Sequence, residues 1–491
     1  MVMRTHVLEI WKALRTSAVV VMLPLSTWAQ GGGAVWEYGP VMNQTRIYAY
    51  TAALDDGRQI VFGGRESGFI SCSYADVFNY ESNSFTAFEM NYPRDAAAVV
   101  KMNDGRFFLA GGGYDYGIAP GYQDAEVFDP ADNTFSYVGE LFIPRMQCAG
   151  AQLADGRVLI AGGWYNPDGA AVAELFTPSM SLFSMTGSMN TPRAAPVVLP
   201  CNDGGALVFG GWPTYGGDLY TSVEYYDAVN NTFSEFSSEL IPEDPGWLVH
   251  SSTESRPIQE KVMFDGRYLF KAYRNTPVFE WALIAFDPDT KTFERISLDA
   301  GLTDGPPEGF YDLVLDAGGH MAYLLGYTYE TTPYPVCLVS VDLHTGHVYM
   351  PETSFTLGAG EWIMGTMSWN RVTEKILFTG ISWSGADYFN GSNLTYIIEP
   401  DYRYTVDMET IAEWNLSVYP NPAHDQVQIE LPPEGNWMLL VTDMFGNRVW
   451  QQSGNGKEIL VMPTGLWPAG MYLLTAEHNG RLQTMKIQVV H

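Results

Sequence analysis

Along the chain, short apolar runs alternate with polar turns that contain Asp, Asn and Gly. Four of these runs share one turn and one ending: DDGRQIVFGG, NDGRFFLAGG, ADGRVLIAGG and NDGGALVFGG, which end at Gly64, Gly112, Gly163 and Gly211. Because Asp-Gly supplies the positive φ that a short hairpin requires, each run is predicted to be a buried β-strand that follows a tight turn. The closing glycine pair marks a place where the strand bends or another backbone approaches closely.

A second pattern, an apolar strand followed by a polar turn and the start of another strand, follows each of these runs. Its four clear copies are VFNYESNSF from Val77, VFDPADNTF from Val127, LFTPSMSLF from Leu175 and YYDAVNNTF from Tyr225. Three weaker copies are AFDPDTKTF from Ala285, SVDLHTGHV from Ser340 and IIEPDYRYT from Ile397. The sequence therefore contains seven units, with a period of about 50 residues.

Seven units of four short strands each predict an all-β fold, a seven-bladed β-propeller over residues 34–405. The period, the double glycine and the aromatic-bearing turn resemble kelch repeats, clearly in the first four units and weakly in the last three. The segment Val35 to Met42 matches the fourth strand of a unit, and the seventh unit lacks such a strand. We therefore expect the N-terminal strand to complete the last blade, which would remove an exposed sheet edge.

The pattern changes after Thr405, where residues 406–413 are predicted to be a linker and residues 414–491 a small domain of alternating strands. Tyr419, Pro420, Asn421 and Pro422, together with Gly470, Tyr472 and Lys486, resemble the type A sorting domain of the type IX secretion system of the Bacteroidetes. The resemblance implies an Ig-like β-sandwich, the secretion machinery as partner, and a protein that is released or attached to the outer surface of the outer membrane. The alternative is an adhesive Ig-like module that stays on the mature protein.

Residues 1–29 are typical of a secretory signal peptide, with Arg4, Lys12 and Arg15 before a short apolar run and a small residue at Ala29. The run is too short to span a bilayer, so we expect no transmembrane segment. Export would place Cys72, Cys148, Cys201 and Cys337 where disulfides persist. Their wide spacing supports no zinc or redox motif, and it leaves open either one disulfide or free, buried cysteines.

The composition excludes one class of partner. The chain has 56 Asp and Glu residues against 26 Lys and Arg residues, a formal net charge of −30. Such a surface repels phosphate backbones, so nucleic acid is not an expected partner. We expect a monomer without a cofactor or a metal ion.

The loops between the second and third strands of the units are rich in aromatic residues. In a propeller these loops share one rim, and exposed rings near Asp and Asn suit the partly apolar faces of sugars. The candidate ligand-binding residues are Tyr114, Tyr116, Trp164, Tyr165, Trp212, Tyr215, Trp281, Tyr329, Trp383 and Tyr388. The alternative is that these rings pack the long loops against one another.

Four arginines begin the first strands of units one to four, and each is followed about 30 residues later by an acid. The pairs are Arg46 with Asp76, Arg94 with Glu126, Arg145 with Glu174, and Arg193 with Glu224. Units five to seven lack both partners, as expected of a buried structural ion pair, because the loss of one partner would leave an uncompensated charge. The alternative is a ring of guanidinium groups that binds an anion.

No catalytic constellation is evident. His344 and His347 have a spacing at which a metal ion can bind, but no third ligand accompanies them, so a solvated turn is the preferred interpretation. The histidine and tyrosine set of the copper radical oxidases that share the kelch fold cannot be placed on this sequence. The sequence favours a module that binds a glycan or a protein. An extracellular carbohydrate-active enzyme and a structural surface protein are the alternatives.

Overall fold

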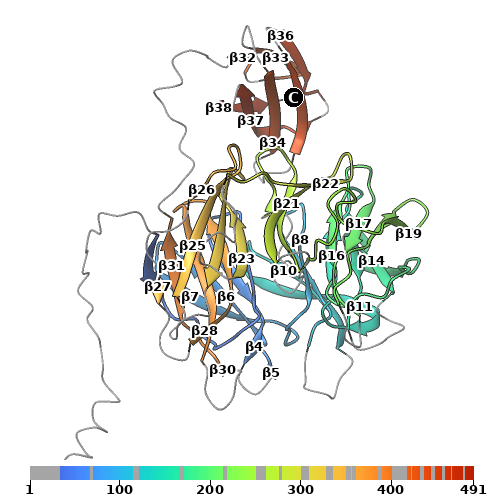
Figure 1. Cartoon of the computed structure of the whole chain (residues 1–491), viewed down its shortest axis with the longest axis vertical. Helices are drawn as coiled ribbons and strands as arrows, with labels where there is room; N and C mark the ends of the chain where they lie inside the picture. The colour runs from blue at the N-terminus through green and yellow to red at the C-terminus, as the bar shows by residue number, and fades with distance from the viewer. Residues whose placement is uncertain are drawn as a thin grey trace, which may run out of the picture. The chain divides into compact units, whose positions relative to one another are not determined.

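Strands dominate the chain in the computed structural model, and the all-β prediction is confirmed (Figure 1). One 3-10 helix, Pro178–Met180, is the only helix in the described part of the chain. The structure describes residues 34–66, 70–113, 121–164, 171–213, 218–249, 261–275, 279–299, 309–327, 335–349, 355–356, 361–383, 390–400, 417–421, 423–431, 436–443, 448–455, 459–465, 467–478 and 481–490. The predicted signal peptide and the predicted linker lie outside these residues.

The first four sheets each contain four antiparallel strands in chain order. The strands of sheet 1 are β2 (Tyr50–Ala53), β3 (Gln59–Phe62), β6 (Tyr74–Asn79) and β7 (Ser84–Glu89). Those of sheet 2 are β8 (Ala98–Lys101), β9 (Phe107–Ala110), β10 (Tyr122–Asp129) and β11 (Thr134–Arg145). Those of sheet 3 are β12 (Ala149–Gln152), β13 (Val158–Ala161), β14 (Ala173–Thr177) and β15 (Leu182–Met185). Those of sheet 4 are β16 (Val197–Pro200), β17 (Ala206–Phe209), β18 (Val223–Asp227) and β19 (Thr232–Ser237). A small hairpin, β4 (Arg65–Glu66) with β5 (Ile70–Ser71), follows β3.

Three further sheets follow with the same strand order but less regular strands. Sheet 5 contains β20 (Tyr268–Arg274), β21 (Glu280–Asp287) and β22 (Thr292–Arg295). Sheet 6 contains β23 (Gly309–Leu315), β24 (Met321–Tyr327), β25 (Pro335–Asp342), β26 (Val348–Tyr349) and β27 (Phe355–Thr356). Sheet 7 contains β28 (Glu361–Asn370), β29 (Lys375–Trp383), β30 (Asn390–Gly391) and β31 (Thr395–Glu399), and its outermost strand is the N-terminal β1 (Val35–Tyr38). β1 pairs antiparallel with β31 from Val35↔Glu399 to Tyr38↔Tyr396.

The Asp-Gly turns behave as the sequence pattern predicts. Gly57, Gly105, Gly156 and Gly204 have φ angles of 88°, 84°, 85° and 94°, in the region that side chains with a Cβ rarely adopt. Each turn joins the first strand of its sheet to the second, so the apolar run after it becomes a strand that is buried along its whole length.

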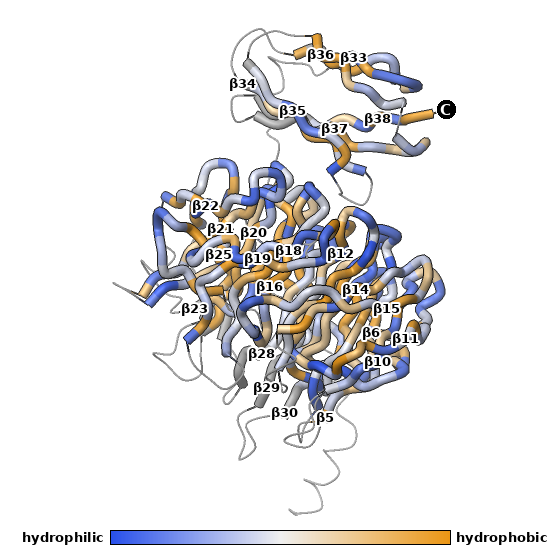
Figure 2. Tube along the Cα trace, turned by 90° about the vertical axis from the view of Figure 1, so that its right-hand side faces the viewer, coloured by the Kyte–Doolittle hydropathy of each residue, from blue (hydrophilic) through white to orange (hydrophobic). Residues whose placement is uncertain are grey.

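Each sheet packs its two faces against its neighbours in the chain. In β9, Phe107 and Leu109 belong to an apolar cluster shared with sheet 1, whereas Phe108 and Ala110 belong to one shared with sheet 3. Similar clusters join sheets 3 and 4, 4 and 5, 5 and 6, and 6 and 7. Figure 2 shows this distribution of apolar residues: the strands are largely orange or pale, and many of the turns are blue. Side chains alternate across a strand, so a strand between two packed sheets is apolar at most of its positions.

Sheet 7 also contacts sheet 1. Phe78 of β6 packs with Leu377 and Ile397 of sheet 7. Buried hydrogen bonds reinforce this contact: Thr51 Oγ1 donates to the Met367 carbonyl over 3.1 Å, and Gln59 Nε2 donates to the Ser368 carbonyl over 2.8 Å. The last sheet is therefore held to the first through both side chains and backbone.

The C-terminal part of the chain forms two sheets of its own. One contains β32 (Ser417–Tyr419), β33 (Gln426–Glu430) and β36 (Ile459–Pro463), and the other contains β34 (Asn436–Asp443), β35 (Arg448–Asn455), β37 (Gly470–His478) and β38 (Arg481–Val489). Buried apolar residues of both sheets form one cluster, which includes Val427, Leu439 and Leu474. This part is therefore an all-β sandwich with its own core.

The four cysteines, Cys72, Cys148, Cys201 and Cys337, are free and buried. Burial raises the pKa of each thiol, to about 12 for Cys201 and Cys337. Of the two possibilities that the sequence left open, the structure shows cysteines that pack as small apolar side chains.

Candidate functional site

The repeated arginines and acids lie together as four buried pairs, with side chains at most 2% exposed. Arg94 Nε lies 2.7 Å from Glu126 Oε1, Arg145 Nη2 lies 2.7 Å from Glu174 Oε1, and Arg193 Nη2 lies 3.5 Å from Glu224 Oε1. Arg46 and Asp76 form the fourth pair. In each of these units, the arginine and the acid that lies about 30 residues later in the sequence are therefore in contact.

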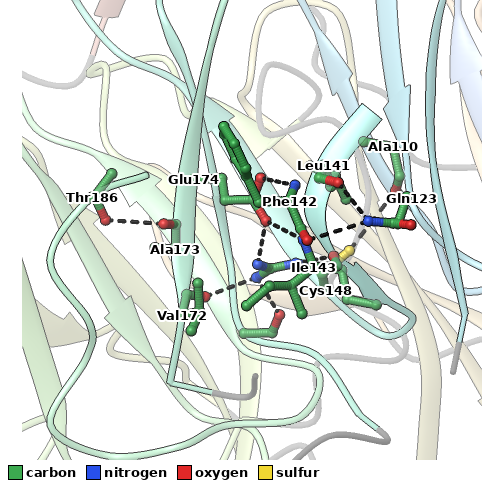
Figure 3. A network of polar contacts seen from close by, with 12 residues as sticks. Ala110, Gln123, Leu141, Phe142, Ile143, Cys148, Val172, Ala173, Glu174 and Thr186 are labelled. Carbon is green, nitrogen blue, oxygen red and sulfur yellow. Dashed lines mark hydrogen bonds and ion pairs between the residues drawn. The ribbon is translucent and has the colours of Figure 1, made fainter. Parts of the chain in front are cut away.

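In unit three, nearly all of the polar capacity of the pair is used within the chain (Figure 3). Glu174 accepts hydrogen bonds from the backbone N–H groups of Phe142 over 2.7 Å and Ile143 over 3.3 Å. Arg145 Nη1 donates to the carbonyls of Gly162 over 2.9 Å and Val172 over 2.8 Å. Charges that are paired and hydrogen-bonded in this way favour a structural role over the binding of an anion.

The glycine pair explains how these arginines connect consecutive units. Arg94 Nη1 donates to the Gly111 carbonyl over 2.6 Å, and the N–H of Gly112 donates to the Arg145 carbonyl of the next unit over 2.9 Å. A Cβ on Gly111 would lie 2.5 Å from the Arg145 carbonyl oxygen. Gly111 also has a φ of 66°. Only glycine therefore allows the backbone of the next unit to approach so closely.

An asparagine three residues before the arginine completes the pair in three of the four units, and our sequence reasoning missed it. The backbone N–H and Nδ2 of Asn91 donate to Glu126 Oε2 over 2.9 and 3.0 Å, and Asn43 and Asn190 bond to Asp76 and Glu224 in the same way. The signal was present as Asn-x-x-Arg ahead of the first strand in units one, two and four.

Most of the predicted rim aromatics cannot be placed. Tyr114, Tyr116, Tyr165, Tyr215, Tyr329 and Tyr388 lie outside the described residues, and Trp383 is described only as the last residue of β29. Trp281 packs among Tyr273, Phe279 and Phe310, with ring centroids 5.3, 5.9 and 5.8 Å away. Trp281 therefore packs against other rings, which is the alternative that the sequence left open for the aromatic loops.

Trp164 and Trp212 occupy the same place in their units, directly after the glycine pair. Trp164 forms a β-bridge with Met146 and Trp212 forms one with Ala194. Trp164 is 38% exposed, which is unusual for so large an apolar side chain, and Trp212 is half-buried. Of the predicted rim residues with described side chains, Trp164 therefore presents the most open ring.

The residues next to Trp164 form a repeated turn. The second residue after each arginine has a positive φ: 55° at Tyr48, 48° at Ala96, 52° at Gln147 and 51° at Ala195. The N–H of Gln147 donates to the Ala96 carbonyl over 2.7 Å, and the N–H of Ala195 donates to the Gln147 carbonyl over 2.7 Å. The N–H of Trp164 donates to the Met146 carbonyl over 2.7 Å. The backbone of Gln147 therefore lies between Ala96 of unit two and Ala195 of unit four, and its neighbour Met146 bonds to Trp164.

A charged pair breaks the repeat at this turn. Asp95 stands where the other units have Ile47, Met146 and Ala194, and Arg65 stands where units three and four have tryptophan. Arg65 Nε donates to Asp95 Oδ2 over 2.5 Å, and the Arg65 guanidinium lies 5.4 Å from the centroid of the Tyr48 ring.

Asp95 is fully buried, and this burial raises the pKa of its carboxyl group although Arg65 opposes the shift. Burial likewise raises the pKa of Tyr48. We call Tyr48, Arg65, Asp95, Gln147 and Trp164 the rim cluster. Sequence reasoning missed all of it except Trp164, although an acid at an otherwise apolar repeat position was visible.

His344 and His347 take different partners. His320 Nδ1 and His344 Nε2 lie 2.9 Å apart, and the Phe264 ring stacks 3.8 Å from the His344 ring. His347, which is half exposed, pairs with Asp299. The two histidines therefore do not converge on a common ligand position.

Acid should destabilise the protein through His320. Burial lowers the pKa of His320 from 6.5 to about 3, so the unfolded chain takes up a proton below pH 6.5 that the folded chain does not. His320 should cost about 1.4 kcal/mol of stability for each pH unit below 6.5. Urea unfolding at pH 7.5 and pH 4.5 should show a smaller loss for His320→Gln than for the unchanged protein. His424→Gln, at an exposed histidine, is the control, and an equal loss in His320→Gln and the unchanged protein would contradict the assignment.

The chain shares its overall fold with a solved fungal alcohol oxidase of the AA5 family in complex with copper. The match covers 92% of this chain and 100% of that one, with a TM-score of 0.54 and 14% sequence identity. At this identity the likeness concerns the fold alone. In the described part of this chain, no group of three His, Cys, Asp or Glu side chains is arranged to hold a metal ion.

The C-terminal residues show where the protein is located. Residues 417–490 match the family model of the secretion system C-terminal sorting domain. The protein is secreted or attached to the outer cell surface. The chain is also 32% identical over 79 residues to an endo-acting ulvan lyase from Formosa agariphila, a match that covers 16% of this chain and 15% of that protein. No described helix is long and apolar enough to cross a membrane.

The structure shows what the predicted residues of the sorting domain do. Asn421 Nδ2 donates to the Lys486 carbonyl over 2.7 Å, and its Oδ1 accepts from the Gln488 N–H over 2.9 Å, so this side chain continues the hydrogen bonding along β38. Tyr472 Oη donates to the Pro468 carbonyl over 2.7 Å. Tyr419, Pro420 and the Lys486 side chain are exposed, Gly470 begins β37, and Pro422 lies outside the described residues.

Proposed function

We propose that residues 34–405 form a single seven-bladed β-propeller of the kelch type, with sheets 1 to 7 as its blades. Three observations support this proposal: every sheet shares an apolar cluster with the next, sheet 7 contacts sheet 1, and β1 from the N-terminus completes sheet 7. In this arrangement a signal peptide at residues 1–29 and the sorting domain bracket the propeller, and the machinery of the type IX secretion system is the partner during export.

The function that the geometry supports best is the binding of an extracellular glycan at the rim cluster. The exposed ring of Trp164 is the observation that carries this proposal. Gln147 directly follows Met146, which pairs with Trp164, and its side-chain oxygen has no donor among the described residues. Sugar rings stack their apolar faces on aromatic side chains while oxygen acceptors bind their hydroxyl groups. A protein ligand is less well matched, because this feature combines one ring with polar acceptors instead of a broad apolar patch.

A second candidate is an extracellular carbohydrate-active enzyme. The partial similarity to an ulvan lyase and the buried Asp95 carboxyl group with its raised pKa favour this candidate. Mass spectrometry of oligosaccharides incubated with the purified protein separates the two functions. Binding without products supports the module, and turnover that is lost in Asp95→Asn supports the enzyme.

The binding function is tested by Trp164→Ala. Loss of the stacked ring should weaken the binding of an oligosaccharide selected on a glycan array by about tenfold or more, equivalent to about 1.4 kcal/mol. Isothermal titration calorimetry measures the change, and Phe236→Ala, which removes another exposed ring (42%) from β19, is the matched control. Equal affinity in the two variants would reject Trp164 as a contact, and the absence of binding to any glycan would reject the function.

A further inference from the structure

We propose that the open edge and the outer face of β36 in the sorting domain are the surface to which an extended, apolar segment of the secretion machinery binds. The inference rests on the sorting-domain match and is independent of glycan binding. β36 is the last strand of its sheet, and in the described part of the chain it pairs only with β33. Its other edge is therefore open to a further strand.

The pairing with β33 shows which backbone groups of β36 are unused. The N–H of Thr464 donates to the Asp425 carbonyl over 2.8 Å, which extends the register of the two strands by a hydrogen-bonded position. Hydrogen-bonded and non-hydrogen-bonded positions alternate along an antiparallel pair. Ile459, Val461 and Pro463 consequently occupy non-hydrogen-bonded positions. The N–H and C=O groups of Ile459 and Val461 therefore point to the open edge, where an added strand can pair with them.

The same two residues expose apolar side chains. Leu460 and Met462 pack in the core of the sorting domain, whereas Ile459 and Val461 are 56% and 48% exposed on the outer face. The strand has the sequence ILVMP, carries no charge and is largely orange in Figure 2. Proteins usually protect an exposed sheet edge with charged side chains, so an uncharged, apolar edge indicates a surface that a partner covers.

A residue of the sorting motif lies on the same face. Tyr419 of β32 is opposite Gln428 of β33, and Gln428 is opposite Val461 of β36. The Tyr419 side chain is 44% exposed, whereas its neighbour Val418 packs against the core. Because side chains alternate across a strand, Tyr419, Gln428 and Val461 form one row on the outer face. The motif tyrosine is therefore open to a partner that binds this face during export.

Charge favours recognition through backbone and apolar groups. Residues 417–490 contain six Asp and Glu residues and four Lys and Arg residues, whereas the whole chain has a net charge of −30. The sorting domain is therefore nearly neutral. A strand with apolar side chains at alternate positions matches this surface, because its backbone pairs with β36 and its side chains lie beside Ile459 and Val461.

Two other occupants fit the surface less well. In a second copy of the chain, antiparallel pairing about Val461 would place Pro463 opposite Ile459, and proline has no N–H to donate. A lipid surface would cover the apolar side chains but would leave the N–H groups of the open edge without hydrogen-bond acceptors in a strand.

Val461→Lys tests the surface in the full-length chain. The lysine places a charge where the apolar contact is expected, so the amount of protein in the medium and on the cell surface should fall by about tenfold or more. Val461→Pro removes an N–H that points to the open edge and should lower export similarly. Met471→Lys, at an exposed methionine (39%) of β37 in the other sheet, is the matched control. It should change export by less than about twofold.

Immunoblots of medium and surface fractions from a host with a type IX secretion system measure export. The unfolding transition of each purified lysine variant should match that of the unchanged protein, because both side chains are exposed. Photo-cross-linking from benzoylphenylalanine at position 461 or 471 of the full-length chain, followed by mass spectrometry, identifies what covers the strand.

A cross-link from position 461, and not from position 471, to an outer-membrane protein of the secretion machinery supports the proposal when Val461→Lys also lowers export. Cross-links from position 461 only to a second copy of this chain or to lipid overturn it. Normal export of both Val461 variants, or an equal loss in Met471→Lys, overturns it as well. These outcomes leave the sorting function itself intact, because deletion of the whole domain tests that function separately.

Discussion

Arg145→Met is expected to lower the free energy of unfolding by about 3–5 kcal/mol, because it leaves the Glu174 carboxylate buried without its cation. The methionine would fill much of the volume, but it cannot replace the donors that satisfy Glu174 and the carbonyls of Gly162 and Val172. Urea unfolding followed by circular dichroism measures the change, and glycan affinity is measured on the same samples.

Two further variants isolate the buried charge. Arg106→Met removes an arginine of unit two that pairs with the exposed Asp104. This change should lower the free energy of unfolding by less than about 1 kcal/mol. Adding Glu174→Gln to Arg145→Met should recover part of the stability, because no buried charge then remains. If Arg145→Met instead abolished ligand binding with its unfolding transition unchanged, the pair would be a binding site and the structural interpretation would be wrong.

Deletion of residues 417–490 is expected to abolish the appearance of the protein in the medium or on the cell surface, because these residues are the sorting domain that directs export. Immunoblots of medium, surface and periplasmic fractions from a secreting bacterial host measure the distribution. The protein should accumulate in the periplasm.

A single substitution makes the same test without removing a domain. Asn421→Ala loses both hydrogen bonds to β38, which should destabilise the sorting domain by about 1–3 kcal/mol and lower export in proportion. Asn230→Ala, which removes an exposed side-chain hydrogen bond in the turn after β18, is the control. Normal export of the deletion variant would show that another part of the chain carries the signal.

Much of the fold was predictable because its determinants are local. Asp-Gly turns have positive φ at the four predicted glycines, and the apolar runs after them are buried strands. The arginines and acids could be matched by their joint presence in four units and joint absence in three, since a buried charge without a partner is costly. The structure places each of these matched residues against its partner.

The candidate site was less predictable, and single residues show why. Trp281 and Trp164 looked equivalent as loop aromatics, yet Trp281 packs among three other rings and Trp164 is exposed. Whether a ring is covered depends on neighbouring sheets that are distant in sequence. The sequence alone does not distinguish Asp95 and Gln147 from other polar residues. Only the packing around them shows that Asp95 Oδ1 and Gln147 Oε1 lack donors among the described residues.

The sequence by itself determined the repeat, the strands and their turns, and the export route, because hydrophobic period, glycine conformation and a sorting motif are properties of short segments. Only the tertiary structure decided which polar groups are satisfied and which side chains stay open at the rim cluster. Burial and hydrogen-bond pairing are set by contacts between units, and those contacts exist only once the sheets have packed.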